Sequence, residues 1–276
     1  MGTIFFLILF PLVVAFVLLV VKADAARGAI VKFAAIVIAA ASIYLAVQYF
    51  RTGDQYFDFH NEAVNYIMMV IEALLAIYII ITGIRHKKYL ASVFAIIQTP
   101  LLIWFELTKG HHIEVVSNMY IDRLSVIMVL IIGIIGTLIC VYALGYMKDF
   151  QHHHAGEKDR RPWFFFVMFL FLAAMFGLVT SNNLIWMYFF WEITSLSSFF
   201  LIGYTKTKEA TNNAFRALIM NLLGGLGFAV GILILGFVYN TLELSTMIAY
   251  GTMYSGIMAI PAAFLAFAGI TKAAQM

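Results

Sequence analysis

Residues 183–204 read NLIWMYFFWEITSLSSFFLIGY, a stretch of 22 residues in which Glu192 is the single charged side chain. A helix needs about 20 mostly apolar residues to cross the hydrocarbon core of a bilayer. Apolar and polar residues do not alternate strictly here, as they would in a strand of a membrane β-barrel. The stretch therefore predicts a transmembrane helix with one carboxyl group near the middle of the membrane.

The rest of the chain repeats this pattern. Of its 276 residues, 64% are hydrophobic and 11% are charged, against about 45–50% and about 25% in soluble domains, so a water-soluble protein is excluded. Nine stretches are long and apolar enough to span a membrane: roughly 3–21, 28–50, 63–84, 89–106, 120–147, 162–180, 183–204, 211–240 and 254–276. We expect an all-α, polytopic transmembrane bundle of about nine spans, the first of which is retained because it lacks the features of a signal peptide.

The positive charges alternate from loop to loop. The loops after the first, third, fifth and seventh spans hold Lys22, Arg27, Arg85, Lys87, Lys88, Lys148, Lys158, Arg160, Arg161, Lys206 and Lys208, whereas the other loops hold only Arg51, Lys109 and Arg123. Cytoplasmic loops carry the excess of Lys and Arg. The N-terminus is therefore predicted outside and the C-terminus on the cytoplasmic side of the inner (plasma) membrane.

Several classes of site are not indicated. The sequence has no GxGxxG, P-loop or HExxH motif, its single cysteine is Cys140, and its net charge is only +3. The histidine runs (His111 and His112, then His152, His153 and His154) fall in predicted loops, where solvated side chains are a better interpretation than metal ligands. We therefore expect no cofactor, no metal, no redox centre and no nucleic-acid partner.

Glu192 and Lys272 are the strongest candidates for chemistry. Glu192 lies ten residues into its span, and Lys272 lies eighteen residues into the last span. A buried carboxyl is costly unless it is protonated or paired with a cation, and a desolvated lysine can release its proton. Both positions favour proton transfer. The alternatives are a protonated, hydrogen-bonded Glu192 and a Lys272 that snorkels to the interface.

Further charges fall inside or near the spans. Arg216 is expected either as a fixed counter-charge for Glu192 or as a snorkelling side chain, because arginine keeps its proton. Glu72, in the middle of its span, indicates a second path, a subunit contact or a protonated structural glutamate. Glu106 and Asp122 stand at span ends, where carboxylates are tolerated. The glycines in NLLGGLGF, residues 221–228, are expected to let helices pack closely.

Several motifs together point to a known family. Asp122-Arg-Leu-Ser opens a span that ends in YALGYM (142–147), Asn182-Asn183-Leu precedes Trp191-Glu192 and SLSSFFLIGY (195–204), and Thr271-Lys272-Ala-Ala-Gln275 closes the chain. This region resembles the large proton-pumping membrane subunits of respiratory complex I, a family shared with multisubunit Na+/H+ antiporters and membrane-bound hydrogenases. The resemblance covers about 150 residues, just over half of the chain.

The resemblance implies roles for three residues and a division of the chain. Glu192 and Lys272 match the key glutamate and the lysine of a broken helix, and Arg216 stands where many relatives have lysine. We expect N-terminal helices with an extra hairpin (63–106) in residues 1–119, and an antiporter-like proton channel in residues 120–276. The family continues with a second, inverted repeat, so the sequence is expected to be an N-terminal portion, truncated in the lysine helix.

The expected function is proton or cation translocation, as a membrane subunit of a complex I-like NADH:quinone oxidoreductase or a hydrogenase-like complex. The chain itself would hold no redox centre and would assemble in the bilayer with other membrane subunits. One alternative is a subunit of a multisubunit Na+/H+ antiporter without a redox partner. A second is a membrane scaffold that transports nothing.

Overall fold

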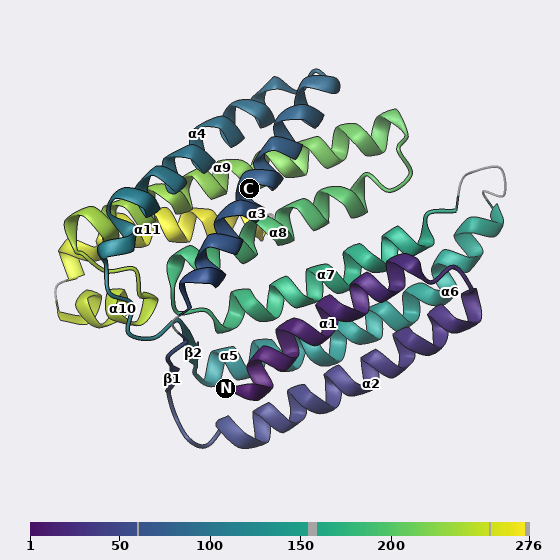
Figure 1. Cartoon of the computed structure of the whole chain (residues 1–276), viewed down its shortest axis with the longest axis horizontal. Helices are drawn as coiled ribbons and strands as arrows, with labels where there is room; N and C mark the ends of the chain where they lie inside the picture. The colour runs from purple at the N-terminus through teal and green to yellow at the C-terminus, as the bar shows by residue number, and fades with distance from the viewer. Residues whose placement is uncertain (60, 154–158, 254, 274–276) are drawn as a thin grey trace. The chain divides into compact units, whose positions relative to one another are not determined.

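The computed structural model describes residues 1–59, 61–153, 159–253 and 255–273. It confirms the all-α class, since the only strands in the described part of the chain are two segments of three residues that pair with each other. In chain order the elements are α1 (Gly2–Val20), α2 (Asp24–Tyr49), β1 (Gln55–Phe57), α3 (Glu62–Arg85), α4 (Tyr89–Thr108), η1 (Gly110–His112), β2 (Met119–Ile121), α5 (Arg123–Leu130), η2 (Ile131–Gly136), α6 (Thr137–His153), α7 (Arg161–Thr180), α8 (Leu184–Ile202), α9 (Lys208–Val238), α10 (Leu244–Met253) and α11 (Ser255–Lys272) (Figure 1).

Packing divides the chain into two compact units, each built from two separate segments. The first unit comprises Met1–Tyr56 and Tyr120–Thr180, and the second comprises Phe57–Met119 and Ser181–Met276. The first unit therefore contains α1, α2, α5, η2, α6 and α7, and the second contains α3, α4 and α8 to α11. The division that we predicted between residues 119 and 120 follows from the family resemblance. The packing units do not test it, so it stays a prediction.

Eight helices of the described chain are long and apolar enough to cross a membrane, one fewer than the nine expected. The difference lies in the last predicted span, 254–276. There the described apolar helix, Met258–Lys272, is shorter than the other eight. Helix α11 ends at Lys272, and residues 274–276 lie outside the described part, so the predicted interruption of this helix stays a prediction.

In the first unit the predicted span 120–147 is helical from Arg123 onward, after strand β2 and the capping residue Asp122, and it changes its winding. A turn of π-helix, η2, joins α5 to α6, and within it Gly133 touches Ser42 of α2 so closely that a Cβ atom would collide with the serine hydroxyl. Helix α6 continues to His153, so the expectation that His152 and His153 lie in a loop is wrong. His154 lies outside the described residues.

In the second unit, α3 and α4 form a hairpin that packs on α8 and α9, and α11 packs along α9. Glycines in α9 permit this close approach. A Cβ atom on Gly227 or Gly231 would lie 2.9 Å from Phe267 or 3.1 Å from Leu265 of α11, and one on Gly224 would overlap Thr271. The packing role expected for the NLLGGLGF glycines is confirmed.

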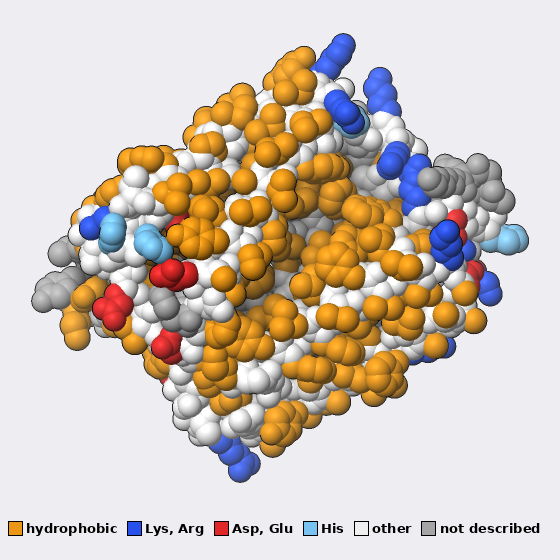
Figure 2. Space-filling view, in the orientation of Figure 1, with side chains coloured by type: hydrophobic (Ala, Val, Ile, Leu, Met, Phe, Trp, Pro, Cys, Tyr) orange, Lys and Arg blue, Asp and Glu red, His pale blue; other side chains and the backbone are white. Residues whose placement is uncertain are grey.

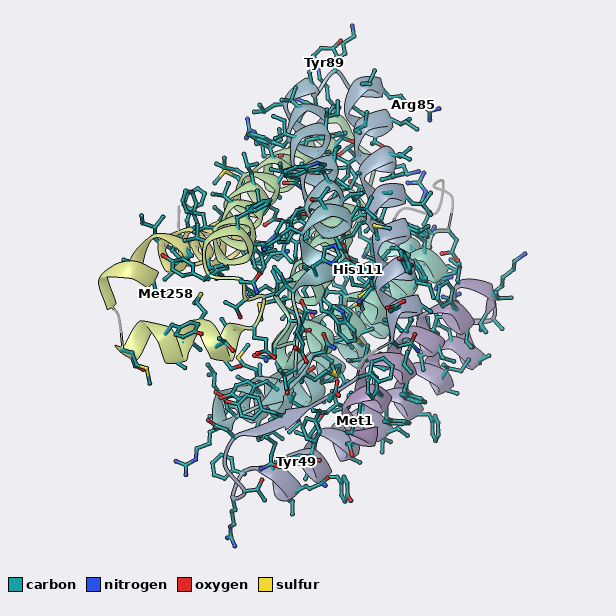
Figure 3. The ribbon with its side chains drawn as sticks, turned by 60° about the vertical axis from the view of Figure 1, so that its left-hand side comes forward. Met1, Tyr49, Arg85, Tyr89, His111 and Met258 are labelled. Atoms are coloured by element: carbon teal, nitrogen blue, oxygen red, sulfur yellow. The ribbon has the colours of Figure 1, made fainter. Side chains whose placement is uncertain are left out.

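The second unit has two chemically different ends. At what we call its basic end, α3 ends with Arg85, and Lys87 and Lys88 follow it. The ring of His86 lies there 5.3 Å from that of Phe215, near the start of α9. At its acidic end, Glu62 begins α3 and Glu106 lies near the end of α4, and Asn118 donates a hydrogen bond to the Phe59 carbonyl. Figure 3 shows Arg85 and Tyr89 at one end of the α3–α4 hairpin and His111 at the other. Charged side chains gather at helix ends while hydrophobic ones cover the helix surfaces (Figure 2).

Candidate functional site

A hydrogen-bond network of asparagine side chains fixes the start of α8. Asn183 caps the helix by accepting a hydrogen bond from the Ile185 amide at 2.9 Å, and its own amide donates to Asn118 Oδ1 at 2.7 Å. The neighbouring Asn182 donates to the Ser117 carbonyl at 2.8 Å and accepts from the Ser245 amide at 3.0 Å. A capping side chain satisfies donors that a helix start leaves unpaired. This network fixes the helical position of every residue that follows it on α8.

Glu192 lies at the contact of three helices. Its side chain is 7% exposed, and its Oε1 accepts a hydrogen bond from Gln98 Nε2 of α4 at 3.1 Å. The facing residue of α9 is Gly225, where a Cβ atom would stand 3.1 Å from both Glu192 Oε1 and Gln98 Oε1. The glycine therefore leaves the room that this buried acid and amide occupy.

Lys272 reaches the same face of α8 from α11. Its Nζ donates to Ser195 Oγ at 2.7 Å and to the Trp191 carbonyl at 3.3 Å, and it lies 4.8 Å from the centre of the Trp191 ring. A cation over an aromatic ring is stabilised by the electron density of the ring face. Lys272 also interacts electrostatically with Glu192. The structure thus brings together the two residues for which the sequence made the strongest prediction.

Arg216 is not part of this cluster. It lies on an exposed side of α9, eight residues after the helix begins at Lys208, and so about two turns inside the helix. Nine residues separate it from Gly225, which is about 14 Å along the axis. Its role as a counter-charge stays a prediction, and this placement favours the snorkelling alternative.

Glu72 is buried in the hairpin, with 6% of its side chain exposed. Its Oε1 has no hydrogen-bond partner among the described residues, and it lies within electrostatic range of Glu106 and Glu192. A second carboxyl group therefore belongs to the same interior as Glu192. The sequence found Glu72 but not its proximity to Glu192, because the two residues are 120 positions apart.

The sequence reasoning missed two residues of the cluster, Gln98 and Ser195. Gln98 is a lone amide in the middle of the apolar run AIIQTPLL, residues 95–102, and an isolated polar side chain at that depth is a signal that could have been used. Ser195 is an uncharged residue of the SLSSFFLIGY motif (195–204) and was not predicted as a site residue. Its hydroxyl donates to the Trp191 carbonyl at 2.9 Å, which orients an oxygen lone pair toward Lys272.

One further prediction concerns a charged residue at a helix start. Asp122 starts α5 by accepting a hydrogen bond from the Ser125 amide at 2.6 Å, as expected for a carboxylate at a helix start. Outside the spans, hydrogen bonds from Arg161 hold the pKa of Asp159 below its ordinary value. Among the described residues, no group of three or more His, Cys, Asp or Glu side chains is arranged to hold a metal ion.

Fold and site together define a polytopic α-helical membrane protein with a buried glutamate, its amide partner and a lysine on the facing helix. Two family profiles match the sequence. The one described as "NADH:quinone oxidoreductase/Mrp antiporter, TM" matches residues 181–276, and "NADH-Ubiquinone oxidoreductase (complex I), chain 5 N-terminus" matches residues 104–156. The chain belongs to the family of proton-conducting membrane subunits that complex I and the Mrp antiporters share.

Its relatives include the "Na(+)/H(+) antiporter subunit A1" of Staphylococcus haemolyticus, which is 30% identical over 191 residues, covering 68% of this chain and 23% of the relative. A second antiporter subunit of that organism is 33% identical over 194 residues, with 67% and 23% covered. The chain therefore spans about a quarter of the length of these relatives. A chain of the archaeal membrane-bound sulfane sulfur reductase has the same fold, with a TM-score of 0.64, 16% identity, and coverage of 98% of this chain and 44% of that one.

Proposed function

We propose that this chain is the ion-translocating part of a membrane subunit of a multisubunit cation/proton antiporter, and that Glu192 and Lys272 carry the proton. The observation that carries the proposal is the buried Glu192, held by Gln98 and in electrostatic contact with Lys272. Relatives that are named as antiporter subunits favour this alternative over the redox-driven complex.

The geometry suggests how the two groups cooperate. Ser195 is one turn beyond Glu192 on α8 and binds the Lys272 ammonium. The carboxyl group of Glu192 and the ammonium group of Lys272 therefore lie against the same face of α8. In such coupled sites, the charge on one group changes the free energy of protonating the other. Moving one charge across the membrane requires about 2.3 kcal/mol per 100 mV. A change of one to two pKa units corresponds to about 1.4–2.7 kcal/mol, which is of the required size.

A redox-driven complex is the second candidate, because the descriptions of both matching family profiles also name an NADH:quinone or NADH-ubiquinone oxidoreductase. The same helices would serve in both assemblies, so the discriminating observation lies outside the chain. Neighbouring genes for iron–sulfur or nickel–iron subunits would favour the redox complex, and genes for further antiporter subunits would favour the antiporter.

Glu192→Gln tests the proposal. The amide keeps the shape of the side chain but cannot carry a proton, so translocation should fall by about a hundredfold or more, the usual scale for losing a proton-transfer group. The measurement is cation-driven proton movement in vesicles that contain the complete purified complex. Glu209→Gln, on the exposed first turn of α9, is the matched control and should leave the rate unchanged. An assembled Glu192→Gln complex that works at the wild-type rate would refute the proposal, and would favour a scaffold that transports nothing.

A further inference from the structure

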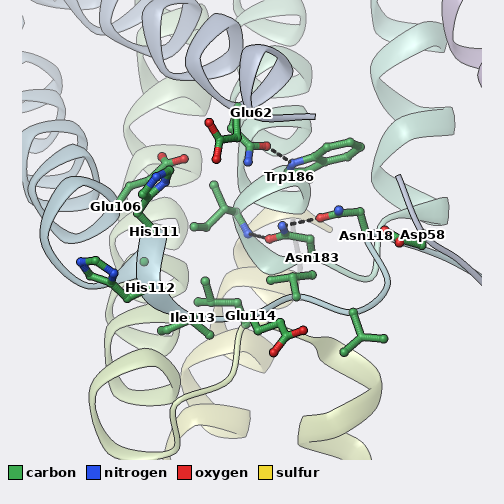
Figure 4. A pocket seen from close by; sticks show the side chains of 16 residues that line it. Asp58, Glu62, Glu106, His111, His112, Ile113, Glu114, Asn118, Asn183 and Trp186 are labelled. Carbon is green, nitrogen blue, oxygen red and sulfur yellow. Dashed lines mark hydrogen bonds between the residues drawn. The ribbon is translucent and has the colours of Figure 1, made fainter. Parts of the chain in front are cut away.

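A cavity of about 480 Å³ opens at the acidic end of the second unit. Figure 4 shows the carboxyl groups of Glu62, Glu106 and Glu114 and the rings of His111 and His112 around it. Among the described residues that line this cavity there is no lysine or arginine. A lining of this kind attracts cations, including hydronium ions, from the adjacent water.

The cavity continues inward at Glu106. This half-buried side chain also lines a second, much smaller cavity, together with Glu72, Leu102, Ile185, Tyr188 and Ile232. The small cavity has a volume of about 10 Å³, which is about the room that one water molecule needs. It is too small for a hydrated metal cation. It is suited to a single water between two carboxyl groups.

The face of α8 that borders these cavities leads directly to the candidate site. Ile185, Tyr188, Glu192 and Ser195 follow one another at intervals of three or four residues, which places them in one row along the helix. The row runs from the small cavity at Ile185 and Tyr188 to the carboxyl group of Glu192 and then to the serine that binds Lys272. From Ile185 to Ser195 it extends about 15 Å.

Polar atoms that lack partners occur along the same route. Among the described residues, Glu72 Oε1 and Gln98 Oε1 are buried without a hydrogen-bond partner. Leaving such atoms buried and unpaired is costly, so two of them on one route need an explanation. A chain of mobile protons and internal water along this row would satisfy them.

We propose that the α3–α4 hairpin supplies a proton path that connects the water at the acidic end of the second unit with Glu192, through Glu106 and Glu72. In the inward direction, Glu106 gives its proton to the water in the small cavity, and that water gives a proton to the Glu72 carboxylate. Glu106 is then reprotonated from the large cavity, and Glu72 passes its proton to Glu192. This inference rests on the proposed function, since the path would serve nothing if Glu192 carried no proton.

Glu72→Gln and Glu106→Gln test this path in the vesicle assay with the complete complex. Glu72→Gln should lower proton translocation at least about tenfold, because no other described carboxyl group lines the small cavity between Glu106 and Glu192. Glu106→Gln should lower it less, since water from the large cavity reaches that position. Glu209→Gln is again the control, and size-exclusion chromatography shows whether each variant remains in the complex.

The outcomes separate this inference from the proposed function. If Glu192→Gln abolishes translocation while assembled Glu72→Gln retains the wild-type rate, the path is refuted and the proposed function stands. If Glu192→Gln has no effect, the proposed function itself fails. If Glu72→Gln lowers the uptake of radioactive sodium but leaves the proton flux unchanged, the path carries sodium and the proton assignment is overturned. Wild-type proton flux in Glu72→Gln together with its loss in the shorter Glu72→Asp, despite assembly, would show that Glu72 acts by shape alone, and would also overturn it.

Discussion

Lys272 combines a positive charge with the ability to lose a proton, and a substitution can separate the two properties. Lys272→Arg keeps the charge, but a guanidinium group stays protonated at every physiological pH. If Lys272 carries the proton, Lys272→Arg should lower translocation nearly as far as Lys272→Ala, measured in vesicles with the complete complex. Ser195→Ala, which removes the hydroxyl that binds Nζ, should have a smaller effect because the Trp191 carbonyl and ring remain. Wild-type translocation by Lys272→Arg would reduce Lys272 to an electrostatic role.

At this scale the sequence identifies charged groups better than their partners. Glu192 and Lys272 could be predicted because a charge in an apolar span is rare and costly. Gln98 was not predicted, because an uncharged amide in the predicted span 89–106 gives a weaker signal than a charge and its partner, Glu192, is 94 positions away. Arg216 could not be placed, since the sequence does not say which side of α9 faces the neighbouring helices.

Helix α9 shows how single glycines set the distance between elements. Gly224→Ala should push Thr271 away and separate α9 from α11, because the new Cβ atom overlaps the threonine hydroxyl. Overpacking of this kind costs about 1–3 kcal/mol, so the temperature at which half of the purified complex loses its native form should fall. Gly145→Ala on α6 is the control: a Cβ atom there meets nothing within 4 Å. Equal thermal stability of the two variants would contradict the close packing of α9 on α11.

The lengths of most helices follow from the apolar runs, but local winding does not. The π-turn η2 has no evident mark in the apolar run 120–147 and lies where Gly133 meets Ser42 of α2. Helix α6 extends to His153 because a helix satisfies its own backbone hydrogen bonds in water as well as in lipid. Hydropathy therefore predicts where a helix crosses the membrane better than where it ends.

For the whole molecule, the prediction that remains to be tested is the orientation in the membrane, with the N-terminus outside. The second unit agrees internally with the charge pattern, because its basic residues lie at the end of α3 and the start of α9, while Glu62 and Glu106 lie at the opposite end.

Cysteine labelling tests this orientation. With Cys140, the single cysteine of the chain, changed to alanine, cysteines at the exposed positions Thr52 and His111 should react with a membrane-impermeant thiol reagent added outside intact cells. Cysteines at the exposed positions His86 and Asp149 should react only after the cells are opened, because neighbouring Lys and Arg residues hold these helix ends in the cytoplasm. The reverse pattern at all four positions would invert the topology and make the acidic cavity face the cytoplasm. Disagreement between Thr52 and His111 would mean that the number of spans between them is odd, and that α3 and α4 do not both cross the membrane.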